Sequence, residues 1–187
     1  RVIMMPMANY PAALAGRRVS PIDDLNMNRI FPGDPDGTVT RQIAHYIDSE
    51  LIPLADLVID LHSGGSSLNY IPTALAKQSA DPVLYQKQLA ALRAFGAPYT
   101  YIQGGAQGQG GDQTLGAGAD RRGRIALGTE LGGAGAVNAS GLAIAERGLR
   151  NLLVHLGILG KEHWADPPAA TRFLDVRGPE MYVYAPE

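Results

Sequence analysis

The chain has 187 residues, 45% of them hydrophobic, which is enough for one folded domain with a sizeable core. Its net charge of -2 and the absence of a basic cluster argue against a nucleic-acid partner or an anionic membrane surface, and no apolar run approaches the roughly 20 residues that span a bilayer. The lack of cysteine excludes disulfides, thiolate metal sites and cysteine nucleophiles, so any metal must be held by histidine and carboxylate groups.

The N-terminal part of the chain combines an apolar run with a long irregular segment. Residues 1–5 predict a short buried strand that ends at Pro6. Residues 6–37 are rich in Pro, Asn, Asp and Arg without clear periodicity, and such segments in compact domains are usually functional or disordered. Because the chain begins and ends inside apolar patterns, we expect it to be a fragment of a longer protein.

The segments that follow alternate between helical and strand patterns. The predicted helices cover residues 38–51, 81–95 and 139–159, with N-caps at Thr38, Asp81 and Asn138. Their expected inward residues are Ile43, Ile47 and Leu51, then Val83, Leu84, Leu89 and Leu92, then Leu142, Leu149, Leu152, Leu153 and Leu156. The predicted strands cover residues 57–61, 99–102 and 125–131. The Gly-rich residues 103–123 lack an apolar repeat and predict a flap or a flexible surface loop.

This alternation predicts an α/β fold with three layers, in which helices cover both faces of a mostly parallel or mixed sheet. We assign residues 1–160 to this α/β domain and residues 161–170, which include Pro167 and Pro168, to a linker. Residues 171–187 predict the start of a β-rich domain, with strands at 173–176 and 181–184.

Two titratable residues each end a predicted strand and meet a Gly-rich turn, which is where sites form in such folds. His62 is a candidate metal ligand, and Glu130 is a candidate general base because burial would raise its pKa. The alternatives are a histidine hydrogen-bonded within its loop and a glutamate paired with an arginine. Asp60 points to the same side of its strand as His62, either to orient that ligand or as a plain surface carboxylate.

Arg18, Asn28 and Arg29 form a second candidate group, in the irregular segment. A guanidinium binds a carboxylate through two hydrogen bonds, and an amide beside it adds another donor. The alternative is a polar loop held by its own hydrogen bonds, and Arg17 is expected to be a solvated neighbour. A single histidine does not complete a zinc site, which takes about three protein ligands.

Five sequence blocks follow one another along the chain: NYPA at 9–12, RVSPID at 18–23, NMNRIFPG at 26–33, DLHSGG at 60–65 and TELGG at 129–133. Together they resemble the succinylglutamate desuccinylase/aspartoacylase family, a branch of the zinc-carboxypeptidase-like fold. The resemblance covers about residues 1–160. The third block is most similar to that of the bacterial subgroup of N-acetyl-diaminobutyrate deacetylases.

The resemblance implies a role for each candidate residue. His62 corresponds to the third zinc ligand, and Glu130 to the base that deprotonates a water at the zinc. Arg18 resembles the oxyanion-stabilising arginine, and Asn28 with Arg29 resembles the pair that holds a substrate carboxylate. One Zn²⁺ per chain is implied, with its first two ligands in a Gly-x-His-Gly-Asn/Asp-Glu motif expected upstream of residue 1.

The implied reaction is zinc-dependent hydrolysis of the amide bond of an N-acylated amino acid or a related small amide, which releases a carboxylate and a free amine. The implied partner is this small-molecule substrate, with a possible homo-oligomer. The absence of cysteine is compatible with a cytoplasmic location. The alternatives are a metal-free binding module (a pseudoenzyme) for an anionic amino acid, and a zinc carboxypeptidase that acts on peptides.

Overall fold

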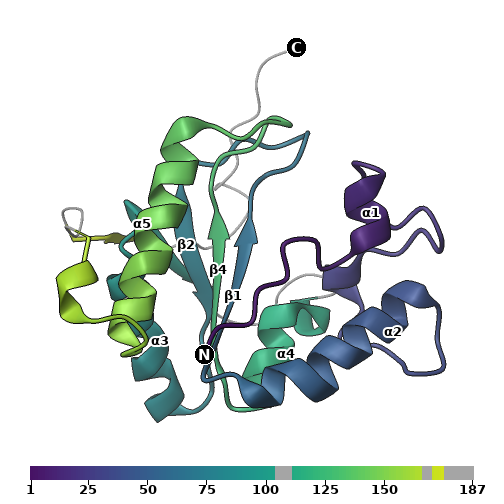
Figure 1. The fold of residues 1–187 in the computed structure, drawn as a ribbon, viewed down its shortest axis with the longest axis horizontal. Helices are drawn as coiled ribbons and strands as arrows, with labels where there is room; N and C mark the ends of the chain where they lie inside the picture. The colour runs from purple at the N-terminus through teal and green to yellow at the C-terminus, as the bar shows by residue number, and fades with distance from the viewer. Residues whose placement is uncertain (104–110, 166–169, 175–187) are drawn as a thin grey trace.

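The computed structural model describes residues 1–103, 111–165 and 170–174, which form a five-stranded sheet covered by helices on both faces (Figure 1). The strand order is β1 (Leu57–His62), β4 (Ile125–Glu130), β2 (Thr73–Lys77), β3 (Tyr99–Gln103) and β5 (Arg172–Leu174). Strand β1 is parallel to β4, and β3 is parallel to both β2 and β5, whereas β2 is antiparallel to β4. The predicted α/β fold with a mixed sheet is therefore confirmed.

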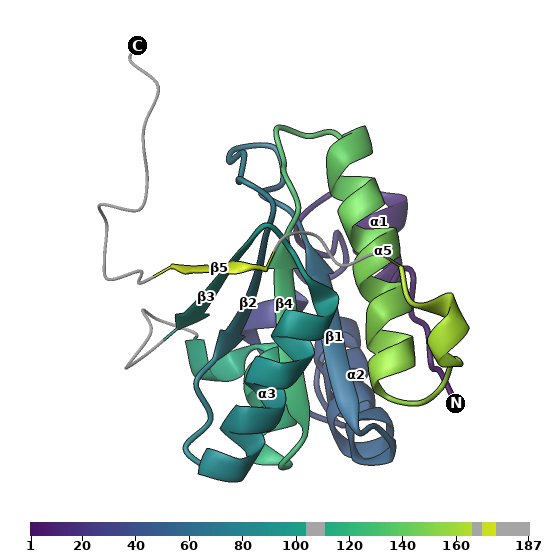
Figure 2. The same cartoon turned by 90° about the vertical axis from the view of Figure 1, so that its left-hand side faces the viewer.

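Two helical layers enclose the sheet. Helices α3 (Pro82–Phe95) and α5 (Ala139–His155) cover one face, and α2 (Val39–Tyr46) and α4 (Leu115–Arg121) lie on the other (Figures 1 and 2). Helix α1 (Tyr10–Leu14) belongs to the long N-terminal segment. A π-helical turn (Ile47–Leu51) and a 3-10 turn (Ile52–Leu54) extend α2, and further 3-10 turns occur at Met27–Arg29, Gly111–Gln113 and Lys161–His163.

The helix starts follow from local chemistry that the sequence already displays. Asp81 accepts a hydrogen bond from the Val83 backbone N–H at 2.8 Å, and Asn138 accepts one from the Gly141 N–H at 2.6 Å. Both predicted caps are confirmed, because each side chain satisfies an N–H that the first helical turn leaves free. Thr38 precedes α2 but makes no side-chain capping bond.

The neighbouring strands β1 and β4 send alternate side chains into two separate cores, because successive residues of a strand point to opposite faces. Ile59 and Leu127 pack toward α3 and α5, in the first core. Val58 and Ala126 pack toward α2 and α4, in the second core, which also contains the buried Phe31 of the N-terminal segment. This burial on both faces explains why each strand reads as a continuous apolar run.

Close contacts lock the helices in place on each side. On the α2 side, the buried Asp48 accepts hydrogen bonds from Arg122 Nε at 2.9 Å and Nη2 at 2.6 Å, which joins the π-helical turn to the end of α4. On the α3 side, Gly148 of α5 lies against the fully buried ring of Phe95.

Several predictions about single elements are wrong. Residues 1–5 form no strand. None of the described strands pairs with them, and their side chains are exposed. Val83 is 64% exposed and Leu142 is 50% exposed, so both predicted inward positions face solvent. The Gly-rich stretch contains α4 from Leu115 onward, and β2 had no predicted counterpart. Residues 104–110 of that stretch lie outside the described residues.

The C-terminal part of the described chain continues the same sheet. Strand β5 pairs with β3, and the Arg93 guanidinium of α3 lies 5.3 Å from the centre of the Phe173 ring. The assignment of residues 171–187 to a separate β-rich domain stays a prediction, and its expected strand at 181–184 lies outside the described residues. Among the helices that the structure describes, none has the length and apolarity needed to cross a membrane.

Candidate active site

The carboxyl ends of β1 and β4 bring three titratable side chains to one face of the sheet. Asp60 and His62 share the face of Val58, and Glu130 shares that of Ala126, so all three project on the α2 and α4 side. In the register of the two strands, His62 lies directly opposite Glu130. The long N-terminal segment packs on this same face, which brings its polar residues to the strand ends.

The turns after the two strands hold each other closely. The Gly64 N–H donates to the Gly132 carbonyl at 2.8 Å, and the Ala134 N–H donates to the Leu68 carbonyl at 2.9 Å. A Cβ atom at Gly133, whose φ is +151°, would lie 2.0 Å from the Leu68 carbonyl oxygen, so only glycine permits this approach. The interlocked turns leave the strand ends little freedom to move.

Thr129 adds a side-chain link between the same strand ends. Its hydroxyl accepts a hydrogen bond from the His62 backbone N–H at 3.0 Å and lies 3.3 Å from the His62 carbonyl oxygen, to which it donates. Thr129 is 1% exposed, so this hydroxyl satisfies polar groups that water does not reach. The backbone of His62 is thereby fixed to the strand that carries Glu130.

The imidazole of His62 makes its contacts through one nitrogen. Its Nε2 lies 2.9 Å from Asp60 Oδ2, and 41% of the His62 side chain is exposed. The Asn28 amide nitrogen lies 3.2 Å from the same carboxylate oxygen and 3.3 Å from Nε2. The hydrogen bond to Asp60 raises the pKa of His62 above its usual value, against partial desolvation, which lowers it.

Asn28 connects three parts of the fold. Its amide nitrogen reaches Asp60 on β1, and its amide oxygen accepts a hydrogen bond from the Leu115 N–H at the start of α4, at 2.8 Å. Asn26 in turn holds the Asn28 backbone N–H at 3.0 Å. The predicted donor to a substrate carboxylate is therefore already engaged with groups of the protein.

Glu130 carries a buried carboxylate oxygen that the described residues leave without a partner. Its Oε2 is buried and has no hydrogen-bond partner among the described residues, which is a costly arrangement for a purely structural group. Burial raises the pKa of Glu130, and the negative charge of Asp60 adds to this, while the positive charges of His62 and Arg18 oppose it. The alternative expectation, a structural pair with arginine, has no support among the described contacts.

The arginines of the N-terminal segment differ in their surroundings. The charge of Arg18 affects the pKa values of both His62 and Glu130, so its guanidinium lies near the two strand ends. Arg18 is exposed and has no hydrogen bond or ion pair within the described part of the chain. Among the described residues, Arg29 donates only to the carbonyl of Asn28, at 2.7 Å. Arg17 pairs with Asp24 at 3.6 Å on the surface.

Two contributors escaped the sequence reasoning. The first is Leu115, whose backbone N–H donates to the Asn28 side chain. It was missed because the glycines at 116 and 118 make the sequence of the short helix α4 read as a loop. The second is Thr129, for which its place beside Glu130 in the TELGG block was the available signal. The roles predicted for Arg18, Asn28, Arg29, His62 and Glu130 stay predictions. The structure brings Arg18, Asn28, His62 and Glu130 to the same strand ends, whereas it shows no contact of the Arg29 guanidinium with the strands among the described residues.

The donor groups of this site suit part of a zinc site. Within residues 1–103, 111–165 and 170–174, no three His, Cys, Asp or Glu side chains gather as a metal-binding group. Among the described residues, His62 Nδ1 has no hydrogen-bond partner, and neither has Oε2 of Glu130 on the neighbouring strand. These donors are compatible with His62 as one ligand of three, and that role stays a prediction.

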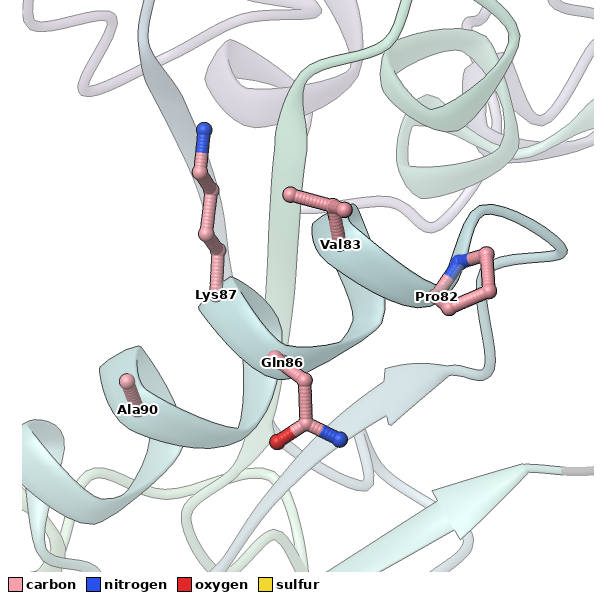
Figure 3. A pocket seen from close by; sticks show the side chains of 5 residues that line it. All are labelled: Pro82, Val83, Gln86, Lys87 and Ala90. Carbon is pink, nitrogen blue, oxygen red and sulfur yellow. The ribbon is translucent and has the colours of Figure 1, made fainter.

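Two hollows elsewhere lack such chemistry. The larger, about 500 Å³, lies on the outer face of α3 and is lined by Pro82, Val83, Gln86, Lys87 and Ala90 (Figure 3). The other, about 390 Å³, is lined by Val154, His155, Lys161 and Trp164. Neither lining contains a carboxylate, whereas Asp60, His62 and Glu130 lie together at the ends of β1 and β4.

Comparison with known proteins gives matches over nearly the whole chain. The chain is 44% identical over 184 residues to the N-alpha-acetyl-L-2,4-diaminobutyric acid deacetylase of Halomonas elongata. This match covers 98% of the chain but 52% of that protein, so the chain spans about half the length of the curated relative it matches.

Solved structures agree with this match. The fold is similar to a succinylglutamate desuccinylase/aspartoacylase from Rhodobacter sphaeroides, with a TM-score of 0.85, 41% identity and coverage of 98% of this chain and 54% of that one. The product-bound ectoine utilization protein EutE from Ruegeria pomeroyi gives a TM-score of 0.86 at 41% identity, over 97% of this chain and 54% of that one. The sequence model of one protein family, the succinylglutamate desuccinylase/aspartoacylase catalytic domain, matches residues 1–156, and the chain belongs to this family.

Proposed function

We propose that this chain provides the catalytic base, one metal ligand and the anion-binding arginines of a zinc-dependent hydrolase that cleaves the amide bond of an N-acylated amino acid. The observation that carries the proposal is Glu130, whose buried Oε2 has no partner among the described residues and which lies opposite His62 at the strand ends. The name of the 44% identical relative, a deacetylase of N-acetyl-diaminobutyric acid, makes that compound the first substrate to test.

The proposed reaction assigns each proton and charge to a residue of this chain. Zinc, when bound, supplies a Lewis acid that polarises the amide carbonyl and makes the attacking water more acidic. Glu130 accepts the proton of that water and passes it to the nitrogen of the leaving amine. Burial raises the pKa of Glu130, which makes it a stronger base toward the water than an ordinary carboxylate.

The two arginines are proposed to bind the charges of the substrate. Arg18, whose charge acts on both His62 and Glu130, would stabilise the oxyanion that forms on the amide carbonyl. A single donor of this kind contributes about 10²–10³-fold to the rate in comparable sites. Arg29 is exposed and has no carboxylate partner among the described residues, so it is available for the carboxylate of the amino acid.

The decisive experiment replaces Glu130 with Gln in the full-length protein. We expect the Glu130→Gln variant to lose about 10²–10⁴-fold in kcat with its zinc content unchanged, because the amide is nearly isosteric but accepts no proton. Turnover is measured on a panel of N-acetyl and N-succinyl amino acids, and zinc by elemental analysis. Glu146→Gln is the matched control, since Glu146 is an exposed carboxylate on α5.

The outcomes separate the candidate functions. Equal activity of the Glu130→Gln variant and the wild type would exclude Glu130 as the base. A full-length protein without zinc and without turnover, which still binds an anionic amino acid, would favour the binding module instead. The guanidinium groups of Arg18 and Arg29, which have no carboxylate partner among the described residues, are compatible with either function, so the ligand affinity alone does not separate the two functions.

A further inference from the structure

Hydrogen-bond geometry around His62 restricts which of its two nitrogens carries the proton. Nε2 lies 2.9 Å from Asp60 Oδ2, which is the distance of a hydrogen bond. An ionised carboxylate only accepts, so the proton of this bond belongs to Nε2. The Asn28 amide nitrogen also only donates, and it lies 3.2 Å from the same carboxylate oxygen.

The remaining contact agrees with this assignment. If Nε2 carried a lone pair instead, that lone pair would face the carboxylate oxygen at 2.9 Å, which is repulsive. The 3.3 Å approach of Asn28 to Nε2 is therefore a consequence of both groups meeting the same Asp60 oxygen. In the neutral ring, the lone pair is then on Nδ1, for which the described residues provide no hydrogen-bond partner.

We propose that Asp60 is a positioning residue that holds His62 with Nε2 protonated and presents Nδ1 to the metal, and that the Asn28 amide holds Asp60. The metal part of this inference rests on the proposed function. Carboxylate–histidine–metal arrangements of this kind fix the ring orientation and make the ligating nitrogen more basic. Asn28 thereby acts on the metal ligand, in addition to or in place of the substrate contact that its sequence block implies.

The surrounding structure is built to keep this arrangement. Asp60 is part of the β1 ladder, opposite Gly128, and 27% of its side chain is exposed. Asn28 is held at both ends of its amide group, by Asp60 and by the Leu115 N–H at the start of α4. The orientation of His62 thus depends on the N-terminal segment, on β1 and on α4 together.

The test uses the full-length protein and two readouts. In the metal-free protein labelled with ¹⁵N-histidine, at a pH where the ring is neutral, we expect the His62 signal to show a protonated Nε2 and an unprotonated Nδ1. The signal is assigned by its loss in His62→Gln. In Asp60→Ala we expect a mixture of the two tautomers, while Asp60→Asn keeps the Nε2–H form because its amide oxygen still accepts a hydrogen bond.

Zinc affinity, measured by competition with a chelator, is the second readout. We expect Asp60→Ala to weaken zinc binding about 10–100-fold and Asp60→Asn to weaken it less. The matched control is Asp56→Ala, because Asp56 is an exposed carboxylate just before β1. Melting temperatures identify any variant that is merely unfolded, and the tautomer of wild-type His62 carries the test if Asp60→Ala does not fold.

Each outcome decides one question. An Nδ1-protonated His62 in the wild type, or an Asp60→Ala variant with unchanged tautomer and unchanged zinc affinity, would overturn the inference. A wild-type protein that binds no zinc would contradict the proposed function, yet its tautomer in wild type and Asp60→Ala would still decide whether Asp60 positions His62.

Discussion

At the scale of single residues, Asp23 shows how a carboxylate organises the irregular N-terminal segment. It accepts hydrogen bonds from the Thr40 N–H at 2.9 Å, the Thr40 hydroxyl at 2.8 Å and the Leu25 N–H at 3.3 Å. Partial burial opposes ionisation of Asp23, but these bonds and one from Thr38 outweigh it and lower the pKa from 3.8 to about 2. The ionised form of Asp23 therefore ties this segment to the start of α2.

This shift predicts a pH-dependent contribution to stability. Since the pKa of Asp23 is lower in the folded protein than in the unfolded chain, its stabilisation is complete above about pH 4 and is lost as the pH falls toward 2. We expect Asp23→Asn to lower the free energy of unfolding at pH 7, and the difference from wild type to shrink between pH 4 and 2. Urea denaturation across this pH range measures it.

The neighbouring Asp24 provides the control for that experiment. Its side chain is 81% exposed and meets only Arg17, at 3.6 Å, so Asp24→Asn should change stability little at any pH. If the free energies of unfolding of wild type and Asp23→Asn differ by the same amount down to pH 2, the stabilisation by Asp23 does not depend on the charge of its carboxylate.

At the scale of elements, the packing of α5 on α3 depends on an absent side chain. A Cβ atom at Gly148 would lie 2.4 Å from Cε2 of Phe95, whose ring is fully buried. Glycine in the middle of a helix costs about 1 kcal/mol relative to alanine. The close approach of the two helices, and the burial of the Phe95 ring that it permits, explain why glycine stands at this position.

We predict opposite effects for two helical glycines. Gly148→Ala should destabilise the protein by about 1–2 kcal/mol, because overpacking a filled core exceeds the gain in helix propensity. Gly116→Ala in α4, where the nearest atoms to the new Cβ lie at 4.0 Å, should be neutral or stabilise by up to about 1 kcal/mol. Urea denaturation compares the two, and a stabilised Gly148→Ala variant would contradict the packing argument.

At the scale of the whole molecule, the candidate site exists only when distant segments fold together. Arg18 and Asn28 belong to the N-terminal segment, His62 to β1 and Glu130 to β4. The hydrogen bond of Asn28 to Asp60 joins the N-terminal segment to β1, and the pairing of His62 with Glu130 joins β1 to β4. Because the unfolded chain does not hold these groups together, a metal bound at His62 stabilises the folded protein as a whole.

The proposed zinc site therefore predicts a metal-dependent melting temperature. Zinc at about 100 times its dissociation constant should add about 2.7 kcal/mol to the stability of the metal-free, full-length protein, which corresponds to several °C. His62→Gln should lose most of this increase. His155→Gln, an exposed histidine at the end of α5, should retain it. An equal increase in the His62→Gln variant would place the zinc elsewhere.

The sequence by itself determined much of this protein, because the relevant information is local. The apolar runs of β1 and β4 and the caps Asp81 and Asn138 are readable without a structure. The same holds for the position of His62 and Glu130 at the ends of apolar strands. The order of the five sequence blocks was specific enough to indicate the family, which the comparisons confirm.

The tertiary structure alone decided which groups meet. Which positions of α3 and α5 face inward depends on how the helices lie on the sheet. Val83 and Leu142 were therefore predicted to face inward from their apolar character alone, although both face solvent. The engagement of Asn28 with Asp60 and with the start of α4 joins residues 32 and 87 positions apart, which no local pattern encodes. These contacts depend on long-range packing, and so does the burial of the Glu130 oxygen that has no partner among the described residues. Packing of distant segments is therefore what brings the candidate residues together.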